Sequence, residues 1–325
     1  MRGSCAGTPA LGYPLASGDV RGCGLRDGET SESYGLVYPE RPIWEHIHLP
    51  AYFSIETTIK CPARCTMCPR PAVIQSRHNK VMPEWMVAKV LDEIDWPCFI
   101  NWEWINEPLC DDRIYGFMAQ AKAKGVRNWI TTTGYLLSDE RARRLLHSGV
   151  DVVVFSIDSL DAPLYEQIRK LPLDRVMENV KAFMAYKERT GSRVDVWVSK
   201  IQLPVTRHES RDEFRRVFTE MGVSHVQFPA YRLRGGAMDR EAGAAMTPDK
   251  SECYFIENEM AITTDGSVVL CPCEAGAWDQ PVASIANRSL REAWFTQERI
   301  DLISLVRSRG LRAYELCRET TGLPE

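Results

Sequence analysis

The stretch "VDVVVFSID" (residues 150–158) is apolar along almost its whole length. A strand without polar alternation is buried on both faces, as in a parallel sheet that is covered by helices. Similar strands recur along the chain, with helical patterns between them. The strands are predicted at 52–58, 98–105, 127–133, 150–158, 193–201 and 225–229, and the helices at 82–94, 111–125, 138–149, 174–190 and 211–222.

Strands that alternate with helices predict an α/β fold with a parallel sheet and right-handed crossovers. The chain has six such units, fewer than the eight of a closed barrel. A doubly wound open sheet and a partial (β/α)6 barrel both fit this count. In either architecture, functional residues are expected at the carboxyl ends of the strands.

Two shorter segments flank this unit, which we place at residues 46–245. Residues 1–45 are rich in Gly, Ser and Pro without periodicity, which predicts a mobile tail. Residues 246–325 begin a different pattern, with a β-hairpin at 259–273 that has Asp-Gly at its turn. A helix at 289–310 follows. We therefore expect a small second domain made of a hairpin and a helix.

The composition is that of a soluble globular protein, with 44% hydrophobic and 26% charged residues and a net charge of −4. This charge indicates neither nucleic acid nor a membrane surface as a partner. No apolar run could span a bilayer, and the N-terminus has no signal-peptide pattern, so a cytoplasmic location is predicted. The 11 cysteines cluster at short spacings, which in such a chain favours metal binding or redox chemistry over disulfides.

The segment "CPARCTMCPR" (61–70) carries three cysteines, Cys61, Cys65 and Cys68, just after the first predicted strand. A structural zinc site would need four ligands, usually in two C-x2-C pairs. Three thiolates on one loop suit an iron–sulfur cluster in which one iron stays open to a small molecule. A zinc site or uncoordinated thiols are the alternatives.

The C-x3-C-x2-C spacing after the first strand resembles the radical S-adenosylmethionine (SAM) superfamily. The resemblance implies a partial (β/α)6 barrel and a [4Fe–4S] cluster on Cys61, Cys65 and Cys68. It also implies that SAM chelates the open iron and is cleaved to methionine and a 5′-deoxyadenosyl radical. A flavodoxin- or ferredoxin-type protein would then supply the electron.

Three further segments resemble this superfamily in the same order along the chain. "WINEP" (104–108) occupies the position of the superfamily's Gly-Gly-Glu-Pro segment, although other residues replace the two glycines here. The resemblance implies that Glu107 receives the SAM amino group. "TTTGYLL" (131–137) resembles a Thr-Asn-Gly turn. "FSIDSLDAPLYEQIRK" (155–170) implies that Ser156 and Arg169 lie near the SAM ribose and carboxylate. Each segment alone could be an ordinary loop.

A second set of cysteines resembles the SPASM or twitch extension of radical SAM enzymes. Cys253 is followed by Gly266 and Cys271 at the spacing of that extension. With Cys273 and Cys317 this makes four cysteines, the number that one closed auxiliary [4Fe–4S] cluster requires. Cys317 stands alone instead of in a C-x2-C pair, so the fourth ligand is open, and a zinc site on the same cysteines is the alternative.

Twitch enzymes of the aminoglycoside type resemble this chain in length and cysteine count. The resemblance implies hydrogen abstraction from a carbinol carbon of a sugar or aminocyclitol, in secondary-metabolite or antibiotic biosynthesis. The product would be a ketone in a dehydrogenase, or an inverted alcohol in an epimerase. A radical SAM maturase of a ribosomal peptide is the main alternative, and a non-catalytic zinc or iron–sulfur protein is the alternative of another class.

Three residues are candidates for acting on the substrate. Arg232 and Arg234 follow the sixth predicted strand, where a guanidinium could stabilise a ketyl oxygen, although ordinary surface arginines are the favoured interpretation. Cys110 follows the Glu107 segment and could return a hydrogen atom in an epimerase. Cys98 begins a strand and is expected in the core.

Overall fold

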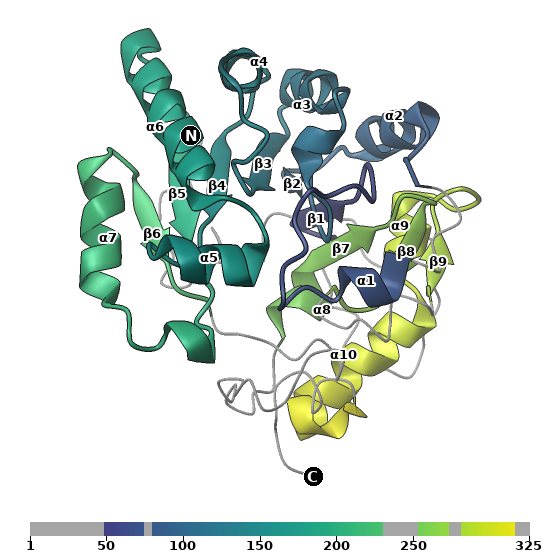
Figure 1. Cartoon of the computed structure of the whole chain (residues 1–325). Helices are drawn as coiled ribbons and strands as arrows, with labels where there is room; N and C mark the ends of the chain where they lie inside the picture. The colour runs from purple at the N-terminus through teal and green to yellow at the C-terminus, as the bar shows by residue number, and fades with distance from the viewer. Residues whose placement is uncertain (1–48, 75–79, 230–252, 273–280, 316–325) are drawn as a thin grey trace, which may run out of the picture.

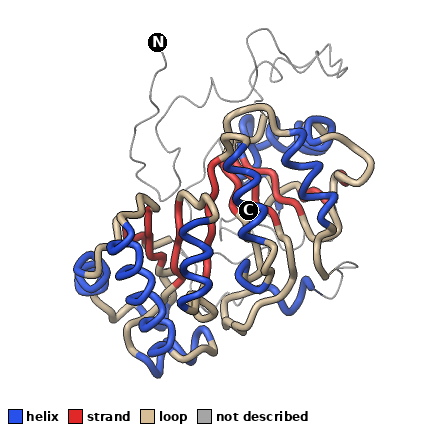
Figure 2. Tube along the Cα trace, turned by 90° about the horizontal axis from the view of Figure 1, so that it is seen from above, coloured by secondary structure: helices blue, strands red, loops and turns tan. Residues whose placement is uncertain are grey.

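Nine strands form one sheet in the computed structural model, which describes residues 49–74, 80–229, 253–272 and 281–315. Their order is β6-β5-β4-β3-β2-β1-β7-β8-β9, and β1 to β6 are all parallel. The strands are β1 (Tyr52–Ile55), β2 (Phe99–Asn101), β3 (Arg127–Thr132), β4 (Val152–Ser156), β5 (Asp195–Ser199), β6 (His225–Gln227), β7 (Glu259–Ile262), β8 (Ser267–Val269) and β9 (Ala283–Ser284). Seen from above, they follow one another as an open band (Figure 2).

The strand order decides between the two architectures that the sequence allows. A doubly wound sheet reverses its strand order at a switch point, whereas β1 to β6 here follow one another in chain order. The predicted partial barrel is therefore confirmed, and its sheet does not close. The helices α2, α3, α4, α6 and α7 form an arc around the outside of the sheet (Figure 1).

The predicted barrel helices lie close to their expected positions, but other helices differ from the prediction. The helices are α1 (Arg70–Val73), α2 (Glu84–Glu93), α3 (Ile114–Ala123), α4 (Asp139–His147), α5 (Ala162–Arg169), α6 (Leu173–Thr190), α7 (Arg211–Glu220), α8 (Tyr254–Asn258), α9 (Leu290–Trp294) and α10 (Gln297–Arg309). Helices α1, α5 and α8 were not predicted. The helix predicted at 289–310 is wrong as one element, because Thr296 caps a new helix and accepts from the backbone N–H of Arg299.

The predicted hairpin forms, but it extends the barrel sheet. Strand β7 pairs in parallel with β1, placing Tyr52 opposite Glu259 and Ile55 opposite Ile262. The turn before β8 contains Gly266 at a φ of +80°, a conformation that favours glycine. A Cβ there would also lie 3.0 Å from the sulfur of Met86. The boundary at 245–246 stays a prediction, because residues 230–252 lie outside the described residues.

The described part of the chain contains no helix with the length and apolarity that a bilayer crossing requires.

Asn128 on β3 links four buried segments of the barrel. Its Oδ1 accepts from the indole of Trp102 at 2.8 Å. Its Nδ2 donates to the carbonyls of Met118 at 2.8 Å and Gly149 at 3.1 Å. Asn128 and Trp102 are both fully buried, so water cannot replace these bonds. The side chain thus ties the start of β3 to α3 and to the loop before β4.

We expect Asn128→Leu to lower the free energy of unfolding by about 3 kcal/mol, because it leaves the buried Trp102 indole without an acceptor and removes the bonds to two carbonyls. Urea unfolding followed by circular dichroism measures this change. Asn287→Leu is the matched control, because Asn287 is exposed, and it should change the free energy by less than about 0.5 kcal/mol. Equal effects of the two substitutions would contradict the role given to Asn128.

Candidate functional site

The loop between β1 and α1 carries Cys61, Cys65 and Cys68, all of which are partly exposed. Burial, and then the negative charge of Glu107, raise the pKa of the Cys61 thiol to about 12. Burial also raises the pKa of Cys65, against the opposing positive charge of Arg169. The negative charge of Cys65 also raises the pKa of Cys61, and that of Cys68 raises the pKa of Cys65. The three thiols therefore form one electrostatically connected group.

These thiols fit a multi-iron cluster better than a single ion. Among the described residues, no three His, Cys, Asp or Glu side chains come together so that they could hold one metal ion. An iron–sulfur cluster takes one thiolate on each iron, so its ligands need not converge on a point. Binding would also deprotonate the thiols outright.

Backbone hydrogen bonds fasten the cysteine loop to the end of α5. The N–H of Arg64 donates to the carbonyl of Arg169 at 3.3 Å, and the N–H of Thr66 donates to that of Ile168 at 2.9 Å. These carbonyls belong to the last turn of α5, whose carbonyls have no partner within the helix. Lys170 then leaves the helix in the left-handed region, with φ +59°. A helix that was not predicted thus holds the cysteine loop.

Arg169 connects this loop to the end of β4. Its Nε lies 2.5 Å from Oδ2 of Asp158, and its Nη1 lies 3.8 Å from the sulfur of Cys65. Burial alone would lower the pKa of Arg169, but the charges of Asp158 and Cys65 outweigh it and raise the pKa. The guanidinium is therefore a permanent cation beside the cysteine loop.

Glu107 is buried and its carboxylate accepts four hydrogen bonds from the chain. Oε1 accepts from the hydroxyl of Thr132 at 2.7 Å and from the N–H of Leu109 at 3.3 Å. Oε2 accepts from the hydroxyl and the N–H of Thr133, at 2.7 and 2.8 Å. A carboxylate has about four acceptor sites. An incoming amino group would therefore have to replace one of these donors, most readily a rotatable threonine hydroxyl.

The Glu107 segment also contacts the cysteine loop and the C-terminal segment. The N–H of Glu107 donates to the carbonyl of Lys60 at 2.9 Å, next to Cys61. The indole of Trp104 donates to the carbonyl of Pro272 at 3.0 Å, next to Cys271. This one segment therefore lies between the two groups of cysteines.

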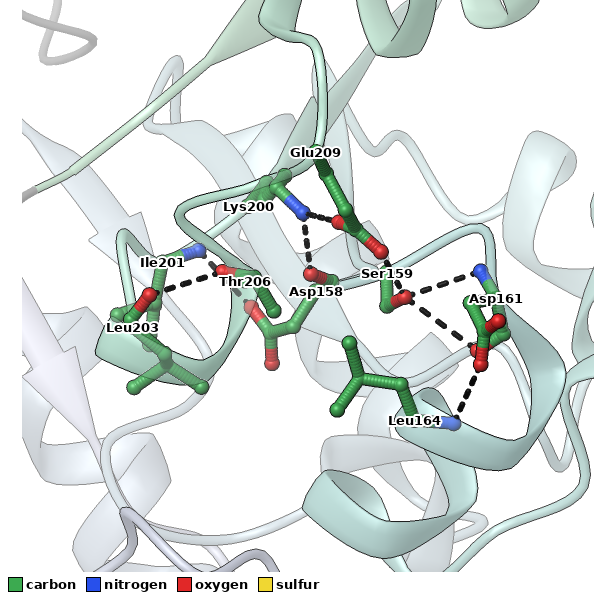
Figure 3. Close-up of polar contacts among 9 residues, drawn as sticks. All are labelled: Asp158, Ser159, Asp161, Leu164, Lys200, Ile201, Leu203, Thr206 and Glu209. Carbon is green, nitrogen blue, oxygen red and sulfur yellow. Dashed lines mark hydrogen bonds and ion pairs between the residues drawn. The ribbon is translucent and has the colours of Figure 1, made fainter.

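A polar network that the sequence did not indicate lies at the carboxyl ends of β4 and β5 (Figure 3). The buried ammonium of Lys200 donates to the carbonyl of Asp158 at 2.6 Å and forms an ion pair with Glu209. The hydroxyl of Ser159 also donates to Glu209, and Oδ1 of Asp158 accepts from the N–H of Ile201 at 2.8 Å. This network fixes Asp158, and through it Arg169. No motif spacing could have revealed it, since its members come from separate loops.

Several buried polar atoms near the cysteine loop have no hydrogen-bond partner among the described residues. They are the hydroxyls of Thr57 and Tyr165 and the Nδ2 of Asn106. Burial raises the pKa of Tyr165, and Arg169, Asp158, Cys65 and Glu107 all act on it electrostatically. Buried polar groups normally have partners. These atoms therefore fit a polar ligand bound at this end of the barrel.

The remaining candidates fall into three groups. Ser156 ends β4 and is partly exposed, and Cys110 lies in a short 3-10 helix directly after Glu107. Burial, then the charge of Glu107, raise the pKa of Cys110 to about 11. Cys98 is buried in the core, as predicted. Four predicted site residues lie outside the described residues: Arg232, Arg234, Cys273 and Cys317.

Cys253 and Cys271 flank the β7–β8 hairpin. Cys253 precedes α8 and Cys271 follows β8, and Cys271 is buried. A buried cation, Arg299 on α10, donates to the carbonyls of Ile256 and Val269, one on each of these two cysteine-bearing segments. The described pair thus lies within one packed unit that continues the barrel sheet.

Comparisons with known proteins agree with this geometry. A tungsten-containing aldehyde ferredoxin oxidoreductase cofactor-modifying protein of Pyrococcus furiosus is 26% identical over 63% of this chain, which spans 59% of that relative's length. PqqA peptide cyclase of Streptomyces rochei is 24% identical over 76% of each chain. The crystal structure of BtrN in complex with AdoMet and 2-DOIA superposes with a TM-score of 0.56 at 15% identity, covering 84% of this chain and 94% of BtrN.

The family model described as "Radical SAM superfamily" matches residues 55–221, which is more than half of the chain. The matched segment contains the cysteine loop, the Glu107 segment, Asp158 and Arg169. This family implies a [4Fe–4S] cluster and SAM, for which three connected thiols and unpartnered polar atoms are present. The chain is thus a member of the Radical SAM superfamily of enzymes.

Proposed function

We propose that this enzyme oxidises a carbinol carbon of a sugar or aminocyclitol to a ketone, in a secondary-metabolite pathway. The observation that carries the proposal is the position of the second cysteine group. Strand β7, at the start of its hairpin, pairs with β1, which leads into the first cysteine loop. Trp104 joins the Glu107 segment to Pro272 beside Cys271. An electron acceptor held there would be close to the substrate.

In this proposal, Cys61, Cys65 and Cys68 hold the first [4Fe–4S] cluster, which with bound SAM supplies the 5′-deoxyadenosyl radical. Glu107 binds the SAM amino group, and Ser156 and Arg169 contact its ribose and carboxylate. Arg169 has both a charge and an anchored position that suit a carboxylate. The Tyr165 hydroxyl, buried without a partner among the described residues, is a further polar contact for the ligand.

The oxidation balances as follows. The carbinol carbon gives one hydrogen atom to the radical, forming 5′-deoxyadenosine. Its hydroxyl would release a proton to solvent water, and Arg232 or Arg234 would stabilise the ketyl oxygen. Cys253, Cys271, Cys273 and Cys317 would hold an auxiliary [4Fe–4S] cluster, which would supply an acceptor for the second electron. SAM cleavage consumes one electron from a flavodoxin- or ferredoxin-type donor.

Two related reactions are the alternatives. Cys110 favours epimerisation, because a pKa of about 11 keeps its sulfur in the thiol form that can give a hydrogen atom. The relative from Streptomyces rochei named PqqA peptide cyclase favours a peptide substrate. BtrN, whose structure contains 2-DOIA, covers more of both chains, and this supports the small-molecule proposal.

We expect the double substitution Cys253→Ala, Cys271→Ala to lower iron from about eight to about four per chain. Anaerobic reconstitution followed by iron and sulfide assay measures this loss. Dithionite-driven formation of 5′-deoxyadenosine should persist, whereas ketone formation should cease. Cys98→Ala is the control, because Cys98 is a buried core cysteine, and it should keep all the iron. Ketone formation by the double variant would contradict the role of the second cysteine group.

A substrate deuterated at the carbinol carbon should transfer its label to 5′-deoxyadenosine, and the product should be a ketone without solvent deuterium. Mass spectrometry measures both products. Solvent deuterium at an inverted carbon would show epimerisation instead, and Cys110→Ala should then abolish it. A modified precursor peptide, with no turnover of aminocyclitols, would contradict the proposed substrate class.

Asp158→Asn should lower the free energy of unfolding by about 3 kcal/mol, because it leaves the buried Arg169 charge without its partner. The variant should also bind less iron at the first cysteine loop. Urea unfolding and iron assay measure the two effects. Asp92→Asn is the control, since Asp92 pairs with Lys124 on the surface, and its effect should stay below about 1 kcal/mol. Equal effects would refute the anchoring role of Asp158.

A further inference from the structure

Arg299 is a fully buried cation that contacts both cysteine-bearing segments of the C-terminal unit. Its Nη1 donates to the carbonyl of Ile256 at 2.9 Å, and its Nη2 donates to that of Val269 at 3.1 Å. Ile256 lies on α8, three residues after Cys253, and Val269 ends β8 two residues before Cys271. The guanidinium therefore sets the distance between the backbones that carry these two cysteines.

The hydrogen bonding of Arg299 is incomplete. Its exposure is 0%, and its Nε has no partner among the described residues. An orphaned donor at such depth destabilises the fold, and more so when the group is charged. The two carbonyls and the face of Trp294, 4.0 Å from the guanidinium carbon, are its other contacts.

The charge of Arg299 also has no direct ion-pair partner among the described residues. No carboxylate among the described residues lies within ion-pair distance of it, whereas Arg169 in the barrel has Asp158 at 2.5 Å. Burial lowers the pKa of Arg299 to about 10, and the charges of Cys271 and Glu259 oppose this. An arginine side chain stays protonated in proteins, so the group is a cation at neutral pH. Buried cations are normally in direct contact with an anion, and Glu259 acts on Arg299 only from beyond ion-pair distance, so a closer anion is expected beside Cys271.

An iron–sulfur cluster with four thiolate ligands would supply both missing partners. Its sulfurs accept N–H···S hydrogen bonds, and its thiolates make it anionic. The hydrogen bonds and charges around such a cluster set its reduction potential. A zinc ion on the same cysteines would offer thiolates too, but no redox state to tune.

We propose that Arg299 is a positioning residue for the auxiliary cluster: it fixes the Cys253 and Cys271 segments, its Nε–H donates to a cluster or thiolate sulfur, and its charge raises the cluster's reduction potential. This inference rests on the proposed function, because it requires the auxiliary cluster. A higher potential favours transfer of the second substrate electron to that cluster. Arg299 would thus place a positive charge beside the auxiliary cluster, which is the electron acceptor in the proposed function.

The test uses the full chain with Cys61, Cys65 and Cys68 changed to Ala, so that the auxiliary cluster is observed alone. Arg299→Met removes the charge at similar volume, and Arg299→Lys keeps it. Arg309→Met is the matched control, because Arg309 is exposed on the same helix and its loss changes net charge equally. The readouts are iron and sulfide content and the midpoint potential from redox titration followed by electron paramagnetic resonance.

We expect a lower midpoint potential in Arg299→Met, and values close to the parent in Arg299→Lys and Arg309→Met. An unchanged potential in a fully loaded Arg299→Met variant would overturn the inference. So would an equal shift in Arg299→Met and Arg309→Met. If the parent itself binds no iron, the auxiliary cluster of the proposed function fails first, and this inference falls with it.

A measurement on unsubstituted Arg299 covers the case in which Arg299→Met does not fold. The parent chain is labelled with ¹⁵N-arginine, its cluster is reduced, and pulsed electron–nuclear double resonance is recorded. We expect a ¹⁵N coupling from a hydrogen-bonded guanidinium, which Arg299→Lys should abolish. Absence of any such coupling in a loaded parent chain would overturn the hydrogen bond.

Discussion

The ion pair between Arg169 and Asp158 is the constraint on which the first cysteine group depends. It joins the end of α5 to the end of β4, and the same turn of α5 accepts hydrogen bonds from the cysteine loop. Asp158 is fixed in turn by Ile201 and Lys200. The loop is therefore held by contacts with the barrel itself, and Cys65 lies close to a permanent cation.

The two cysteine groups belong to one continuous sheet. Strand β1 leads into the first group, and β7, which lies beside it, belongs to the hairpin of the second. Each group has a buried arginine, Arg169 beside Cys65 and Arg299 beside Cys271. Arg169 has a carboxylate partner, whereas Arg299 has only neutral acceptors among the described residues. This difference is expected if the charge of Arg299 interacts with a bound anionic group, as proposed above.

Much of the fold could be predicted because each barrel element has a local signal. The apolar run at β4 and the Ser138 cap of α4 are examples. Helix α5 was missed because it is short, and the break at Thr296 was missed because helical periodicity continues across it. The family segments indicated Cys61, Glu107 and Arg169 as site residues. They did not indicate that threonine hydroxyls donate hydrogen bonds to the Glu107 carboxylate.

The sequence by itself determined the α/β class, the parallel strands and the cysteine spacing, since periodicity and spacing are local properties. Only the tertiary structure decided that the sheet is an open barrel and that the hairpin continues it beside β1. It alone also showed the Asp158–Lys200–Glu209 network and the incomplete partners of Arg299. These features depend on contacts between residues far apart in the chain, where burial and charge act through space and leave no pattern along the sequence.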